Sequence, residues 1–180
     1  MNFLGELCQK EIEKTDVVLD MGCGIMQATL DMIPTYPKTR LLCAELVGID
    51  RFRKYLEVIK TQVSTVEGDI LSAPFREKSV DVILLLDVLE HLVPEDVSHV
   101  LRDTERIARK KIIVSTPFKW SENENINAYD LGENVLQRHK TIISPRFLAE
   151  RGFDVKVVRF GLRLRFWKRP QITYAVRSLA

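Results

Sequence analysis

Along this 180-residue chain, short apolar runs alternate with segments whose apolar residues recur at helical spacing. Five of the runs have the length and composition of buried strands. They are residues 16 to 20, 46 to 50, 63 to 67, 81 to 87 and 111 to 116. Strands that alternate with helices form a parallel sheet with right-handed crossovers. The pattern therefore predicts an α/β fold with a doubly wound sheet.

The C-terminal part of the chain has a different pattern. Ser144 and Pro145 are typical of a helix N-cap and a first helical position, and Gly152 is placed to end that helix. Two strands are predicted after it, over residues 153 to 160 and 171 to 177, with no helix between them. We therefore expect these two strands to pair antiparallel at one edge of the sheet.

The composition is that of an ordinary globular protein, with 46% hydrophobic and 29% charged residues. Three cysteines without a CxxC pair favour a reducing compartment over a disulfide scaffold or a four-thiolate zinc site. The N-terminus lacks the apolar core of a signal peptide, and the longest apolar run is too short to span a bilayer. We expect a cytoplasmic protein without a membrane span.

One domain is expected over residues 1 to 180. Its polar segment 119 to 141 holds no clear period and is a candidate substrate cap. Four side chains of this segment are candidate contacts for an acceptor: Trp120, Tyr129, Arg138 and His139.

The net charge of +2 is distributed unevenly. Residues 140 to 180 contain ten basic and two acidic side chains, which leaves a charge of −6 on residues 1 to 139. Four of the cations are interleaved with aromatic residues: Arg163, Arg165, Lys168 and Arg169. Such a cluster suits an RNA backbone, an anionic surface or an acidic substrate, and it is also typical of a solvated hairpin tip.

Acidic residues end the first three predicted strands, at the sheet edge where such folds bind ligands. Asp20 precedes Gly22 and Gly24, which allow a tight turn and a close approach of the backbone to a ligand. Asp50 and Asp69 end the next two strands. The structural alternatives are a helix N-cap for Asp50 and a turn residue for Asp69.

These carboxylates predict a site for a nucleoside that carries a positive charge and no phosphate. The phosphate-loop motif is absent, and Gln27 stands where the dinucleotide fingerprint has its third glycine. A carboxylate at position 20 suits a cationic ligand, and one at position 50 can accept hydrogen bonds from ribose hydroxyls.

Five segments together resemble the class I S-adenosylmethionine-dependent methyltransferases. They are VVLDMGCG (17 to 24), LVGID (46 to 50), EGDI (67 to 70), SVDVILLLDVLEHL (79 to 92) and RGFDV (151 to 155). The resemblance implies a three-layer, seven-stranded sheet in the order 3-2-1-4-5-7-6, mostly parallel with an antiparallel C-terminal strand.

The resemblance also implies S-adenosylmethionine as cofactor. The cofactor-binding residues would be Asp20, Gly22 and Gly24 for the methionine part, Asp50 for the ribose, Asp69 with the backbone of Ile70 for the adenine, and Asp87 near the methionine end. The family usually has a third glycine where this chain has Met26, a departure in the loop that passes close to the cofactor.

The segment from Asp87 to His91 has three interpretations. Glu90 and His91 belong to the family's common EHL signature, which supports the fold. His91, Asp87 and His139 are candidate catalytic residues, as a general base near the methyl acceptor. Asp87, Glu90, His91 and His139 are also an alternative site for Mg²⁺, Mn²⁺ or Zn²⁺. That arrangement is similar to the acid-x-x-Glu-His motif and distant histidine of small-RNA 2′-O-methyltransferases, with aspartate first and a shorter spacing.

The expected activity is methyl transfer from S-adenosylmethionine to an acceptor, for which we favour a small molecule. No [DNS]-P-P-[YF] motif follows the fourth predicted strand, which argues against methylation of exocyclic base amines. One alternative is an RNA or protein methyltransferase that docks through the basic C-terminal hairpin. Another is a cofactor-binding subunit without activity of its own.

Overall fold

A computed structural model describes residues 3–26, 29, 43–120, 122–123, 126–127, 129–159 and 171–179. Its elements are α1 (Phe3–Gln9), β1 (Val17–Met21), β2 (Glu45–Asp50), α3 (Arg53–Ile59), β3 (Ser64–Glu67), η1 (Ile70–Ser72), β4 (Val80–Leu86), η2 (Leu89–His91), α4 (Pro94–Ile107), β5 (Ala108–Pro117), η3 (Val135–Gln137), α5 (Pro145–Ala149), β6 (Asp154–Arg159) and β7 (Gln171–Ser178).

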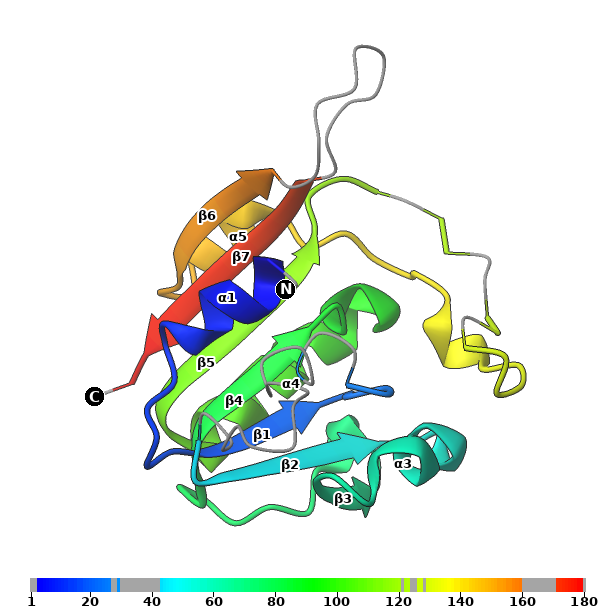
Figure 1. Cartoon of the computed structure of the whole chain (residues 1–180). Helices are drawn as coiled ribbons and strands as arrows, with labels where there is room; N and C mark the ends of the chain where they lie inside the picture. Colours follow the sequence, from blue (N-terminus) through cyan, green and yellow to red (C-terminus); the bar gives the residue numbers. More distant parts are fainter. Residues whose placement is uncertain are drawn as a thin grey trace.

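The strands form one sheet in the order β3-β2-β1-β4-β5-β7-β6. The first five strands of that order pair in parallel, and β7 pairs antiparallel with both β5 and β6. Figure 1 shows β7 running against β5. The predicted fold class and strand order are confirmed.

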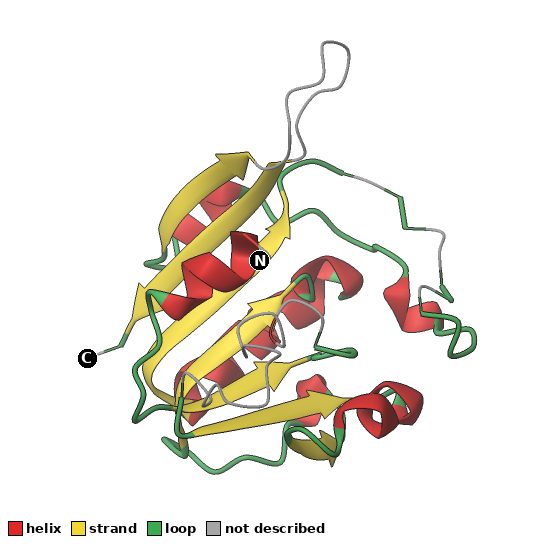
Figure 2. Cartoon of the chain, in the orientation of Figure 1, coloured by secondary structure: helices red, strands yellow, loops and turns green. Residues whose placement is uncertain are grey.

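Helices cover both faces of the sheet. Along β4, Val82 and Leu84 join the apolar cluster of α1 and α3, while Ile83 and Leu85 join the cluster of α4 and α5. Figure 2 shows α1 on the near face, with α4 and α5 behind the sheet. Since successive side chains of a strand point to opposite faces, apolar residues at consecutive positions produce these three layers.

β5 begins earlier than the sequence predicts, at Ala108, immediately after α4. Its exposed Arg109 and Lys110 have the composition of a loop, but both bind carboxylates near the amino ends of β4 and β1. Arg109 Nη1 lies 3.3 Å from Asp81 Oδ1, and Lys110 Nζ lies 2.5 Å from Asp16 Oδ1. These ion pairs lie at the end of the sheet opposite the predicted ligand site.

The helix predicted after Ser144 is confirmed as α5, with the Ser144 hydroxyl accepting from Phe147 N at 3.1 Å. The basic cluster Arg163, Arg165, Lys168 and Arg169 lies outside the described residues. Within the described part of the chain, no helix combines the length and apolarity needed to cross a bilayer.

Candidate functional site

A tight turn follows β1 at the carboxyl edge of the sheet. Gly22 and Gly24 have positive φ angles of 73° and 53°, which glycine adopts without a steric penalty. Gly22 N and Cys23 N both donate to Ile49 O, at 2.8 and 3.1 Å. Gly24 N donates to Asp50 Oδ2 at 2.9 Å. The end of β2 therefore fixes the turn that the sequence predicts to contact the cofactor.

Met26, which departs from the family's third glycine, also has a positive φ of 56°. Its side chain is buried, because Gly48 in β2 leaves space for it. A Cβ atom on Gly48 would lie 2.6 Å from Met26 Cε and 2.8 Å from Cys23 Sγ. The backbone at Met26 thus keeps a conformation typical of glycine, and the side chain turns into the core.

Asp20 lies beneath this turn and is 2% exposed. Its Oδ2 accepts a hydrogen bond from the Thr29 hydroxyl. Burial, together with the nearby charge of Asp50, raises the pKa of Asp20 to about 7. A cation bound beside Asp20 would stabilise its ionised form, as the sequence predicts for a cationic ligand.

Asp50 ends β2 and holds two backbone groups. Its Oδ1 accepts from Phe52 N at 2.7 Å, in addition to the bond from Gly24 to its other oxygen. The N-cap of α3 is Phe52, so the alternative interpretation of Asp50 as that cap is wrong. Each carboxylate oxygen keeps a lone pair for a ligand hydroxyl.

Asp69 has a structural role at the end of β3. Its Oδ1 accepts from Leu71 N at 2.9 Å and caps η1, as a turn residue would. Its Oδ2 lies 3.2 Å from Arg51 Nη1. The side chain nevertheless borders the cavity described next.

Two adjoining cavities of about 480 and 140 Å³ lie at the carboxyl edge. Both cavities are lined by four shared residues: Gly22, Asp87, His91 and Gln137. Other predicted site residues divide between them, with Asp20, Gly24, Glu90 and His139 on the larger cavity and Asp50, Asp69 and Ile70 on the smaller. The structure therefore brings together all of the predicted cofactor-binding residues.

Asp87 and Glu90 follow β4 and line the larger cavity, where Glu90 is buried and Asp87 is exposed. Asp87 has a positive φ of 55°, and its Oδ1 accepts from Ser115 Oγ at 3.1 Å. Desolvation by the surrounding cavity wall raises the pKa of Asp87. Burial and the neighbouring charge of Asp87 raise the pKa of Glu90 to about 8.

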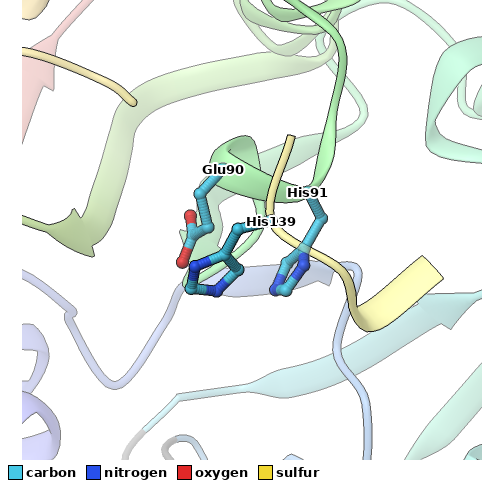
Figure 3. A group of neighbouring side chains, drawn as sticks. All are labelled: Glu90, His91 and His139. Atoms are coloured by element: carbon cyan, nitrogen blue, oxygen red, sulfur yellow. The ribbon is translucent and has the colours of Figure 1, made fainter. Parts of the chain in front are cut away.

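His91 and His139 face each other beside Glu90, as Figure 3 shows. Their ring centroids are 4.8 Å apart, and the ring of Trp120 lies 6.4 Å from that of His139. Burial and His139 lower the pKa of His91 to about 4, so this imidazole is neutral at physiological pH.

Several residues of the polar segment 119 to 141 line the larger cavity, and the sequence predicted only some of them. Tyr129 and His139 line the larger cavity as expected, whereas the Arg138 side chain is exposed and its carbonyl lies 3.3 Å from His91 Nδ1. Gln137, which lines both cavities, and Thr29, which binds Asp20, were missed. A single sequence carries no signal for either, because both are ordinary polar residues outside any motif.

Comparison with known proteins identifies relatives of this chain. A family model described as a methyltransferase domain matches residues 19–114. The carboxy-S-adenosyl-L-methionine synthase of Dichelobacter nodosus is 30% identical over 98 residues, which are 52% of this chain and 40% of that protein. An uncharacterized methyltransferase-like protein of Schizosaccharomyces pombe is 26% identical over 76 residues, 41% of this chain and 27% of that protein. The chain thus matches less than half of the length of either relative.

Solved structures share the fold at low sequence identity. A SAM-dependent methyltransferase from Archaeoglobus fulgidus is 19% identical with a TM-score of 0.66, covering 97% of this chain and 94% of that one. Magnesium protoporphyrin IX methyltransferase from Synechocystis PCC 6803, solved with bound SAM, is 18% identical with a TM-score of 0.58, covering 97% and 76%.

Proposed function

Because the methyltransferase domain model matches residues 19–114, more than half of the chain, the chain belongs to that family, and we propose that it transfers the methyl group of S-adenosylmethionine to a small-molecule acceptor. The observation that carries this proposal is the pair of adjoining cavities, which collects carboxylates from the ends of β1, β2 and β3.

The residues present fit S-adenosylmethionine. Asp20 and the turn at Gly22 and Gly24 would hold the cationic methionine part, where a buried carboxylate lacks a cationic partner among the described residues. Asp50 would accept from the ribose hydroxyls, and Asp69 with the backbone of Ile70 would flank the adenine. When bound, S-adenosylmethionine supplies an activated methyl group on a sulfonium.

The larger cavity supports a small acceptor. Its volume of about 480 Å³ has to take the methionine part as well as the acceptor, and Tyr129, Gln137 and His139 of the polar segment line it. That segment would act as the substrate cap, orienting the acceptor and excluding water. Asp87, His91 and His139 would orient the acceptor and take up its proton where the nucleophile has to lose one.

Calorimetric titration with S-adenosylmethionine and S-adenosylhomocysteine tests whether the chain binds the proposed cofactor. We expect binding of both, and an Asp50→Ala affinity at least tenfold lower, since a hydrogen bond to a charged group is worth about 1.5–3 kcal/mol. Asp154→Ala, which removes an exposed carboxylate on β6, is the matched control and should bind as the wild type does. Absence of binding by the wild type would contradict the proposal.

A methyl-transfer assay on cell extract, separated into RNA, protein and small molecules, tests the acceptor class. Transfer into the small-molecule fraction is the expected result. Transfer into RNA or protein would instead support docking through the basic C-terminal residues, and cofactor binding without any transfer would support a non-catalytic subunit.

A further inference from the structure

We propose that Glu90, His91 and His139 form a binding site for a divalent transition-metal ion, represented by zinc. Each of the three side chains offers one ligand atom, and these atoms all lie within 4.8 Å of one another. Two ligands of one tetrahedral zinc ion are roughly 3.3 Å apart. Small side-chain rotations would therefore bring the three atoms around an ion.

The ligands come from two segments that the backbone fastens together. Lys140 N and Thr141 N both donate to Glu90 O, at 2.7 and 3.1 Å. These bonds place His139 next to η2, which carries Glu90 and His91 (Figure 3). The site is thus assembled by main-chain hydrogen bonds and does not depend on an ion to bring the ligands close.

Hydrogen bonds behind two of the ligands orient them as in metal sites. His91 Nδ1 lies 3.3 Å from Arg138 O, and a ring nitrogen can bond to a carbonyl only by donating. That bond leaves the lone pair on His91 Nε2. Glu90 Oε2 accepts from Thr116 Oγ1 at 3.1 Å. Such outer partners fix the tautomer and the direction of metal ligands.

The second carboxylate oxygen of Glu90 independently indicates a ligand. Glu90 is 2% exposed, and its Oε1 has no hydrogen-bond partner among the described residues. A buried polar atom without a partner is costly, so such an atom calls for an explanation. A cation between Oε1 and the two imidazoles would satisfy it and would offset the nearby charge of Asp87.

The donor set selects the type of ion. Two imidazoles and one carboxylate suit zinc and its first-row neighbours, whereas Mg²⁺ and Ca²⁺ prefer oxygen ligands alone. Asp87, the fourth ligand considered from the sequence, is not part of the group, and its Oδ1 accepts from Ser115 instead. Three protein ligands leave a coordination position open.

That open position lies in the 480 Å³ cavity, since all three ligands line it. An oxygen atom of the acceptor would bind there, so the site favours acceptors with a hydroxyl or carboxylate group. In the metal-loaded protein the two histidines would act as ligands, and Asp87 would remain to take up a proton. This role rests on the proposed function, whereas binding of the ion does not.

Zinc binding to the untagged full chain tests the site. Chelator-treated protein is titrated with Zn²⁺ against a competing fluorescent chelator, and bound metal is counted by elemental analysis after gel filtration. We expect one zinc per chain, with affinity at least tenfold lower in His139→Ala and in Glu90→Gln. Glu90→Gln keeps the side-chain shape, and circular dichroism checks the fold of both variants.

His99→Ala is the matched control, because His99 lies on α4 outside the group, with Nε2 2.9 Å from Leu71 O. It should bind zinc as the wild type does. Cobalt(II) is a second probe, and its absorption spectrum should lack the charge-transfer bands of thiolate ligands. Failure to bind either ion saturably at micromolar concentration, or equal affinity in all variants, would overturn the proposal.

S-adenosylmethionine binding is measured on the same chelator-treated and zinc-loaded samples. Cofactor binding without metal binding would remove the metal site and leave the proposed function intact. Metal binding without cofactor binding would support the metal site and contradict the proposed function.

Discussion

Replacing Gly22 by alanine should destabilise the protein through two separable effects. Gly22 has a φ of 73°, and an alanine in that conformation costs about 1–2 kcal/mol. Its Cβ would also lie 2.9 Å from Val88 Cγ2 and 3.0 Å from Val88 Cγ1. Val88 is buried, so this overpacking adds about 1–3 kcal/mol. The expected loss in unfolding free energy is therefore about 2–5 kcal/mol.

Gly24→Ala is a matched control two residues away. Gly24 has a φ of 53°, but no atom lies within 4 Å of an added Cβ. Only the backbone cost of about 1–2 kcal/mol should remain. The difference between the two variants measures the contact with Val88.

Urea unfolding followed by circular dichroism gives both free energies. Adding Val88→Ala to Gly22→Ala should recover the overpacking cost, as a coupling energy of about 1–3 kcal/mol in a double-mutant cycle. Equal losses in the two glycine variants, or a coupling energy of zero, would refute the assignment of the extra cost to Val88.

Two further predictions concern buried carboxylates. Asp20 has its pKa raised to about 7, so between about pH 4 and 7 the unfolded chain has lost a proton that the folded chain keeps. The unfolding free energy should therefore fall as the pH rises through this range, by up to about 4 kcal/mol, and Asp20→Asn should remove that part of the fall. Identical pH profiles of wild type and variant in thermal unfolding would contradict this. Asp81→Ala should cost about 1–3 kcal/mol in urea unfolding, because it leaves Val17 N, now 2.9 Å from Asp81 Oδ2, without its acceptor. A loss no larger than that of Asp154→Ala would show that this bond contributes nothing.

The fold follows from sequence because its signals are local. Apolar runs, Ser144 with Pro145, and glycines at strand ends each act within a few residues, and they correctly predict a parallel sheet with an antiparallel C-terminal pair. The strand order, also correct, was implied by the resemblance to the class I methyltransferases. The start of β5 was missed because Arg109 and Lys110 become strand residues only through distant carboxylates, 28 residues away for Asp81 and 94 for Asp16.

The site also has a part that the sequence predicts from local signals and a part that depends on distant contacts. Asp20, Asp50 and Asp69 were placed together because parallel strands end at one edge. The contact of His139 with Glu90 and His91 depends on how the polar segment returns to the sheet, which no periodicity records. Met26 is a case in which the sequence suggested a disturbance that the structure does not have. Its side chain replaces the family's third glycine without displacing the turn, because it fits into the space beside Gly48 of β2.

The main-chain bonds from Lys140 and Thr141 to Glu90 O have a consequence for protein engineering. The polar segment leaves the sheet at the end of β5 and is tied back by amide groups that nearly every residue type possesses. A cassette taken from another family member and spliced between Pro117 and Lys140 would therefore keep its anchorage whatever side chains it carries. Because Gln137 of this segment lines both cavities, such an exchange would change the walls of the cofactor site as well as those of the acceptor site.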